Sequence, residues 1–184
     1  MNLLKNCSLL LVAAIAMNTS FAQEKTVEVG GAAMYPSKNI VENAVNSKDH
    51  TTLVAAVKAA GLVETLESAG PFTVFAPTNE AFDKLPKGTV DMLVKPENKA
   101  KLTGILTYHV VSGKLDSKEL ARLIMAGNGT AELTTVQGGK LWVMMKGKKV
   151  VLKDETGGMA TVTVKDVYQS NGVIHVVDQV VMHK

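Results

Sequence analysis

The spacing of apolar residues changes along the chain, from a helical period in the first part to strand-like alternation in the last part. Between residues 40 and 60 apolar side chains recur every three or four positions, and Gly61 is placed to end a helix there. Further short helices are predicted for residues 79–85, 90–94 and 99–106, because prolines separate these apolar segments.

From Ala131 onward the pattern is typical of β-structure. Residues 141–145 and 150–152 flank a Lys-Gly-Lys turn, and residues 160–167 and 173–177 flank a turn that contains Asn-Gly. Asn-Gly between β-branched runs favours a hairpin, because both residues tolerate positive φ. Helices that precede mostly antiparallel strands indicate an α+β fold.

An earlier strand is predicted for residues 72–76, which are largely apolar on both faces. Such a strand lies inside a sheet that is covered on each side. Pro77 cannot donate to a ladder and ends the strand, and Thr78 can cap the helix that follows. Alternation over residues 108–111 predicts a return to strand.

The N-terminus has the pattern of a secretory signal peptide over residues 1–22. Lys5 precedes an apolar run over residues 7–17, and Ser20-Phe21-Ala22 fits a small-x-small cleavage site. We therefore predict cleavage after Ala22 and a periplasmic or secreted protein. The alternatives are a membrane anchor or a buried N-terminal helix, although the run is too short to span a bilayer.

Residues 23–36 are predicted to form an extended arm, since Gly30-Gly31 and Pro36 disfavour regular structure. Residues 37–184 then form one domain. The only cysteine lies in the predicted signal peptide, so the exported chain must be stable without disulfides. This feature fits a bacterial periplasmic or secreted protein.

Charge and motifs exclude several functions. The net charge of +3 is too balanced to predict nucleic-acid binding, and no later segment has the length of a membrane span. The sequence contains no nucleophile elbow, no phosphate-binding glycine loop and no paired-carboxylate motif. We predict no enzyme activity, no catalytic residue, no metal and no cofactor, and we make no prediction of oligomeric state.

Three segments in order resemble the signature motifs of the fasciclin domain. They are residues 73–82, residues 106–111 with Tyr108-His109 at their centre, and residues 171–178. The resemblance implies a β-wedge of two sheets with a helical layer packed against it. It also implies a non-enzymatic, extracytoplasmic adhesion or matrix-binding module, whose partner is a cell-surface or matrix protein or a polysaccharide. The motif residues assigned to structure are Thr73, Phe75, Pro77, Thr78, Phe82, Asn171, Gly172, His175 and Asp178.

Two groups of residues are candidates for partner contact. The resemblance implies that Tyr108 and His109 contact a partner, because this region has been proposed as an integrin-contact motif in animal members. Their place in an apolar run favours a structural role instead. Lys146, Lys148 and Lys149 form a basic turn that could bind an anionic polymer. The alternative for these lysines is a solvated edge that discourages aggregation.

The alternative function is a periplasmic protein that binds a small molecule or a metal. It depends on His109 and His175 and on the methionines of the mature chain, such as Met144-Met145. Adjacent strand residues point to opposite faces, so this methionine pair does not serve one site easily, and core filling is favoured.

Overall fold

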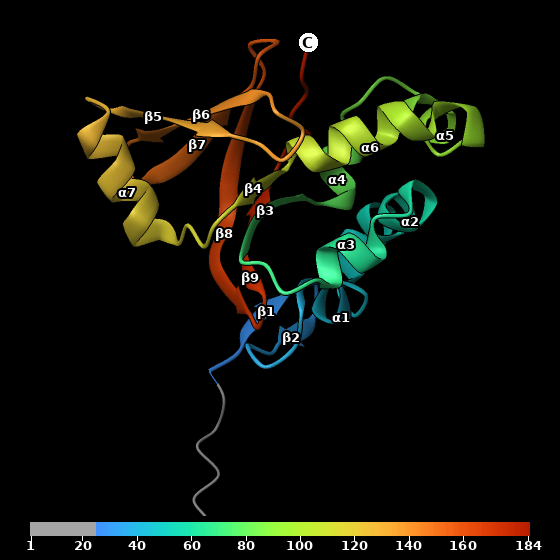
Figure 1. Ribbon diagram of the computed structural model, residues 1–184, viewed down its shortest axis with the longest axis horizontal. Helices are drawn as coiled ribbons and strands as arrows, with labels where there is room; N and C mark the ends of the chain where they lie inside the picture. Colours follow the sequence, from blue (N-terminus) through green and yellow to red (C-terminus); the bar gives the residue numbers. More distant parts are fainter. Residues whose placement is uncertain (1–24) are drawn as a thin grey trace, which may run out of the picture.

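The computed structural model describes residues 25–184, and the predicted signal peptide and its cleavage site lie outside them (Figure 1). The helices are α1 (Ile40–Ala44), α2 (Thr51–Ala60), α3 (Val63–Glu67), α4 (Asn79–Asp83), α5 (Thr89–Leu93), α6 (Lys99–Tyr108) and α7 (Ser117–Ala126). Two 3-10 turns are η1 (Lys48–His50) and η2 (Pro96–Asn98). The strands are β1 (Val27–Val29), β2 (Ala32–Met34), β3 (Phe72–Pro77), β4 (Val110–Ser112), β5 (Thr130–Thr134), β6 (Lys140–Lys146), β7 (Lys149–Lys153), β8 (Met159–Gln169) and β9 (Gly172–Val177).

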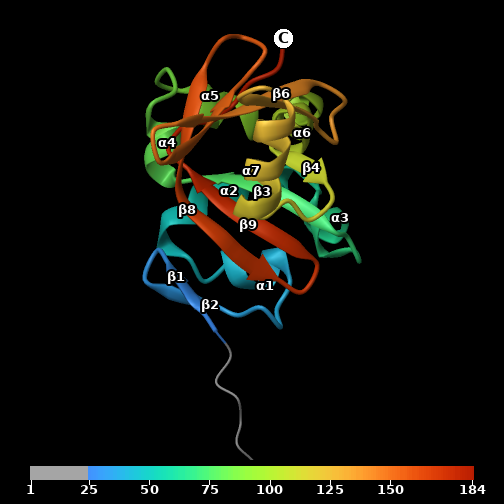
Figure 2. The same ribbon diagram turned by 90° about the vertical axis from the view of Figure 1, so that its left-hand side faces the viewer.

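Seven of these strands are connected in the order β4-β3-β9-β8-β7-β6-β5. The pair β3–β9 is parallel and the other pairs are antiparallel. The long strand β8 joins two leaves: its start, Met159–Thr161, pairs with β7, and the rest pairs with β9. Breaks in register around Val164 bend β8 between the leaves. Figure 2 shows β8 and β9 side by side, running obliquely across the molecule.

Helices cover the leaves and create two apolar cores. Helices α1, α2, α3 and α6 pack against the β3–β9 leaf, and α7 packs against β5 and β6 (Figure 1). In β3, Val74 and Ala76 enter the core beneath the helices, whereas Phe75 enters the core between the leaves. The predictions of an α+β wedge and of a strand covered on both faces are therefore confirmed.

The prediction of an irregular N-terminal arm was wrong for residues 27–34. They form the hairpin β1–β2, whose buried residues Val29 and Met34 join the helical core. Gly30 and Gly31 have φ of +58° and +72°. These values suit a tight hairpin turn, so the two glycines that were taken to break structure instead allow it.

The prediction of a strand at residues 108–111 was wrong at its start. Tyr108 is the last residue of α6, and β4 begins at Val110. The buried side chains of α6 recur with a helical period up to Tyr108; they are Leu102, Ile105, Leu106 and Tyr108 itself. Residues around Tyr108 fit a strand period as well as a helical one, and the burial of this helix face favours the helix.

The β8–β9 hairpin is confirmed, but positive φ is not its cause. Neither Asn171 nor Gly172 has positive φ. A Cβ on Gly172 would lie 2.1 Å from the carbonyl oxygen of Phe72, so close approach of strands requires this glycine.

The Asn171 side chain connects this hairpin to the helical layer. Its Oδ1 accepts from the amide of Ile40 at 3.1 Å, and its Nδ2 donates to the carbonyls of Leu66 at 2.7 Å and Ser68 at 3.0 Å. One buried amide thus satisfies backbone groups at the start of α1 and the end of α3.

We predict that Asn171→Ala lowers the free energy of unfolding by about 1–3 kcal/mol, because it leaves buried backbone groups without partners. Urea denaturation measures the change. Asn46→Ala is the matched control, since the exposed Asn46 side chain donates only to the Glu42 carbonyl. A parent-like midpoint for Asn171→Ala would contradict the role of this side chain.

Candidate binding surface

The three motifs meet at the centre of the protein. In the parallel pair β3–β9, Thr73 lies beside Val173 and Phe75 beside His175. The His109 carbonyl accepts from the Phe75 amide at 2.9 Å, which brings the end of α6 to the same place. These motif residues are therefore close together but enclosed.

Tyr108 is fully buried and connects α6 to the leaf of β5, β6 and β7, which we call the outer leaf. Its hydroxyl donates to the carbonyl of Lys140, at the start of β6, and accepts from the amide of Glu155 at 3.2 Å. Burial raises the pKa of Tyr108 to about 12. The side chain is thus a neutral connector between two layers, with no exposed surface for a partner.

His109 is also enclosed, with 2% of its surface exposed. The amide of Val181 donates to Nε2 at 3.1 Å, so the ring hydrogen lies on Nδ1 and is donated to the Ile105 carbonyl at 2.8 Å. Burial lowers the pKa of His109 to about 4. Direct contact of Tyr108 or His109 with a partner stays a prediction, and it requires this region to open.

His175 connects the bulge of β8 to the start of α7. Its Nε2 lies 2.8 Å from the Leu115 carbonyl, and its Nδ1 accepts from the amide of Asp166 at 3.4 Å. The Asp166 carboxylate in turn accepts from the amide and hydroxyl of Ser117. The ring stacks on Phe75 with 5.7 Å between centroids, and burial lowers the pKa of His175.

The other structural motif residues also have internal contacts. The Thr73 hydroxyl donates to the Gly113 carbonyl at 2.6 Å and accepts from the Leu115 amide. Thr78 caps α4, as predicted, and the Asp178 carboxylate accepts from Thr161. The side chain of Phe82 is buried, and Pro77 ends β3. These contacts are those expected of structural residues, and their share of the stability stays a prediction.

The basic turn is exposed and electrostatically uncompensated. Lys146 and Lys149 face each other as the last pair of β6 and β7, and Lys148 lies in the turn between them. Like charges in such a pair repel. Within residues 25–184 the ion pairs are Arg122–Glu119 and Lys140–Glu132, so neither compensates the turn.

The outward face of the same hairpin carries the only tryptophan, which sequence reasoning missed. Trp142 is half-buried and pairs with Lys153 on β7 and Glu132 on β5. The sequence pattern could have placed Trp142 on this outward face. Side chains alternate along a strand, and its neighbours Leu141 and Val143 point inward. An open groove of about 480 Å³ passes Trp142; its lining also includes Met144, Lys153, Glu155 and Lys184.

A metal centre requires a cluster of the usual metal-binding side chains. Within residues 25–184, no three His, Cys, Asp or Glu side chains gather closely enough to hold a metal ion. Met145 and Met159 are exposed on the outer leaf, with 44% and 41% of their surfaces accessible. In the same part of the chain, no helix combines the length and apolarity needed to cross a membrane.

We predict that stability falls as the solution is acidified below about pH 6.5, the ordinary pKa of histidine. His109, His175 and His50 all have a pKa lowered by burial, so the unfolded chain binds protons that the folded protein excludes. For His109 the change from 6.5 to about 4 corresponds to about 3 kcal/mol, lost progressively towards pH 4. Urea denaturation at about pH 7 and about pH 4.5 measures it. An equal free energy of unfolding at the two pH values would contradict the conclusion that these histidine rings are buried in the neutral form.

We also predict that His175→Ala lowers the free energy of unfolding by about 1–3 kcal/mol, because it leaves the Leu115 carbonyl without its donor. Partner binding then falls only in step with the folded fraction. The control is His183→Ala in the C-terminal tail, since that half-buried ring has one hydrogen bond, with the Lys184 carbonyl, and a tilted contact with the Tyr108 ring. Loss of binding with parent-like thermal unfolding would instead place His175 in the binding site.

Comparison with known proteins assigns the fold. A family model for the fasciclin domain matches residues 48–183. Protein sll1483 of Synechocystis is 46% identical over 168 residues, which are 91% of this chain and 86% of that protein. The pig transforming growth factor-beta-induced protein ig-h3 is 40% identical over 128 residues, 70% of this chain and 17% of that protein.

A solved FAS1 domain pair from the insect cell adhesion molecule fasciclin I has a similar structure. The TM-score is 0.55 at 24% identity, over 71% of this chain and 43% of that one. With the matching family model and the Synechocystis relative, these findings show that the chain belongs to the fasciclin domain family.

Proposed function

We propose that this protein is a non-enzymatic adhesion or matrix-binding module that acts outside the cytoplasm, in the periplasm or after secretion. Membership of the fasciclin family supports the proposal, since a solved relative comes from a cell adhesion molecule. The predicted signal peptide supports the location.

We place the partner surface on the outward face of β6 and β7 and assign it to an acidic polysaccharide. The observation that carries this is the combination of Trp142 with a row of lysines. Along the face, Lys146 and Lys149 at the turn are followed by Met144 and then by Trp142 opposite Lys153. The lysines supply positive charge without internal partners, and an indole offers a flat apolar surface for a sugar ring.

The buried motif residues favour this surface over the Tyr108-His109 segment. A partner reaches the hairpin without disturbing the fold. Contact with Tyr108 requires α6 to separate from β6, and contact with His109 requires it to separate from the C-terminal segment at Val181. Metal binding, part of the alternative function, has no cluster to support it within residues 25–184. Small-molecule binding has a separate observation in its favour, an apolar crevice under the helices.

We predict that Lys148→Glu with Lys149→Glu weakens binding to a polyuronate such as alginate about fourfold or more. Each exposed charge contact contributes about 0.2–1 kcal/mol, and the change removes two attractions and adds two repulsions. Binding of the parent also weakens with added salt. The free energy of unfolding changes by less than about 0.5 kcal/mol. Titration calorimetry measures affinity and urea denaturation measures stability.

The control is Lys95→Glu with Lys101→Glu, which makes the same change of net charge at exposed positions in the helical part. This control retains binding if the hairpin is the site. Equal loss in both double variants would show attraction by net charge alone and would overturn the assignment.

A further inference from the structure

We propose that the crevice between the helical layer and the β3–β9 leaf binds a small, lipid-like molecule with one oxygen acceptor, and that His50 donates the hydrogen bond to that oxygen. The site lies on different elements from the lysine hairpin. It is therefore independent of the surface assigned above.

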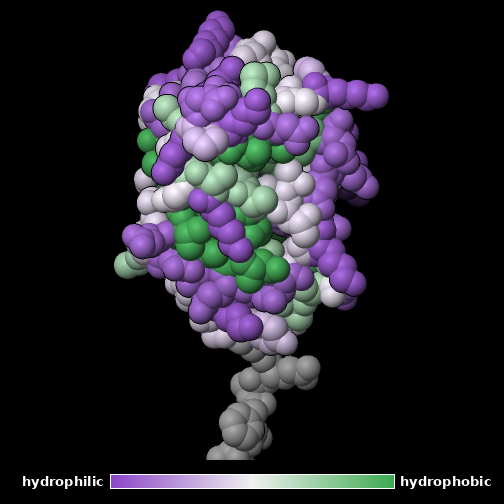
Figure 3. Space-filling model, turned by 90° about the vertical axis from the view of Figure 1, so that its right-hand side faces the viewer, coloured by the Kyte–Doolittle hydropathy of each residue, from purple (hydrophilic) through white to green (hydrophobic). Residues whose placement is uncertain are grey.

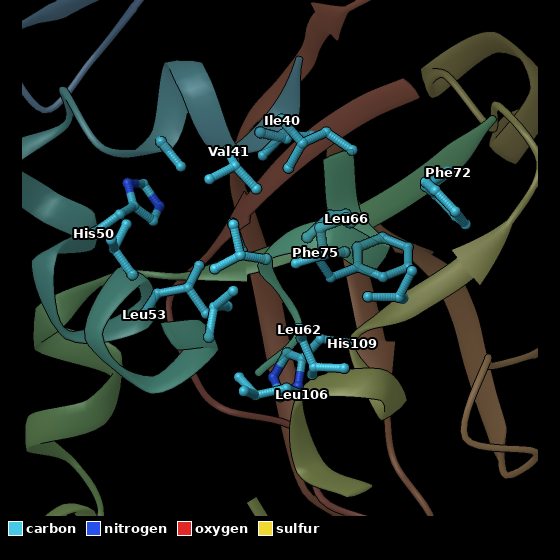
Figure 4. Close-up of a pocket in the computed structure, with 18 of the residues that line it drawn as sticks. Ile40, Val41, His50, Leu53, Leu62, Leu66, Phe72, Phe75, Leu106 and His109 are labelled. Atoms are coloured by element: carbon cyan, nitrogen blue, oxygen red, sulfur yellow. The ribbon is translucent and has the colours of Figure 1, made fainter. Parts of the chain in front are cut away.

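The crevice has apolar walls contributed by several elements. The crevice holds a cavity of about 80 Å³. It is lined by Ile40 of α1, Leu53 of α2, Leu66 of α3, Val74 of β3 and Ile174 of β9. Figure 4 shows Ile40, Leu53 and Leu66 converging from the helices around a common space beside the sheet. A lining that is apolar with very few polar groups has the composition typical of a small-molecule site.

The crevice reaches the surface. Val41, Val54 and Leu62 at its rim are half-buried, and Lys58 and Val136 are exposed. The face of the molecule that carries the helices shows apolar patches among hydrophilic side chains (Figure 3). A ligand can thus enter between the helices while the fold stays closed elsewhere.

His50 is the polar group that the fold leaves unsatisfied in this crevice. The residue is 3% exposed, and its Nδ1 lies 2.8 Å from the Ser47 hydroxyl. Within the described residues, Nε2 of His50 is the one buried side-chain nitrogen or oxygen without a hydrogen-bond partner. Figure 4 shows the ring at one end of the crevice with a nitrogen turned towards the lining side chains. A buried polar atom without a partner is rare and costly, and a ligand oxygen would satisfy it.

The direction of the hydrogen bond follows from the surroundings of the ring. Burial lowers the pKa of His50, so the ring is neutral and carries one hydrogen. The Ala76 carbonyl raises that pKa, as an acceptor beside an N–H does, but it does not meet Nε2 in hydrogen-bonding geometry. In the proposed arrangement the Ser47 hydroxyl donates to Nδ1, so the ring hydrogen lies on Nε2 and makes this atom a donor.

The size of the cavity limits the ligand. A dry cavity of about 150 Å³ holds a benzene molecule, and this one has about half that volume. It therefore encloses the slim end of a chain, and the remainder lies along the apolar rim. The recognised chemistry is an alkyl chain with a carbonyl or hydroxyl oxygen near its enclosed end.

The proposal is tested with two isosteric probes, 2-octanone and 2-methyl-1-octene. The first has a carbonyl oxygen where the second has a methylene group, and the two molecules are otherwise the same. Methyl NMR signals of Ile40, Leu53 and Leu66 follow the titration. We expect both probes to shift these signals, and the ketone to bind about 2- to 10-fold more tightly, the contribution of one hydrogen bond. In His50→Leu the two probes should bind equally, while the variant stays folded and its binding of polyuronate is unchanged.

Ala44 is a half-buried residue in the lining of the crevice, and Ala44→Phe should weaken the binding of both probes. Val45→Phe adds the same ring at the next position, which is 49% exposed and outside the lining, and should bind as the parent does. Absence of methyl shifts with either probe would show a packing void and overturn the proposal. A ketone preference that persists in His50→Leu, or parent-like binding by a folded Ala44→Phe, would overturn the assignment of His50 or of the crevice.

Discussion

The central parallel pair β3–β9 is covered on both faces, and this constraint governs the rest of the structure. Polar groups on these strands have no access to water, so each requires a partner inside the protein. Thr73 forms hydrogen bonds with backbone groups of Gly113 and Leu115. His175 does so with backbone groups of Leu115 and Asp166. The same contacts determine where the chain before α7 and the bulge of β8 lie.

This constraint explains why the residues with the most suggestive chemistry are buried. Tyr108, His109 and Asn171 each satisfy groups on separate elements and thereby connect the helical layer, the central strands and the outer leaf. A fold that uses its aromatic and imidazole groups in this way leaves binding to its periphery. Within residues 25–184, the outer hairpin carries exposed lysines without ion-pair partners, and the crevice under the helices contains the Nε2 atom of His50, which has no hydrogen-bond partner.

The sequence predicted features that depend on local pattern. The doubly apolar strand β3, the Thr78 cap and the β6–β7 and β8–β9 hairpins follow from residue type and spacing, and the fasciclin motifs predicted the family. Tyr108 was misplaced because its run fits both a helical and a strand period, and only burial decides. Gly30-Gly31 was misread because the same pair serves a loop or a tight turn.

The candidate sites were less accessible to sequence reasoning. The lysines of the basic turn could be found from spacing, and Trp142 could have been found from the alternation of β6. The isolated nitrogen of His50 could not, because it depends on which carbonyls and hydroxyls surround the ring after folding.

The central claim is that the signature motifs form the scaffold and that partners bind at the outer leaf. Backbone and indole NMR shifts recorded during titration with a polyuronate test it most directly. The account predicts that shifts concentrate on residues 142–153, including the Trp142 indole, and leave Tyr108, His109 and His175 unchanged. Shifts centred on Tyr108 and His109, with a silent hairpin, would contradict it.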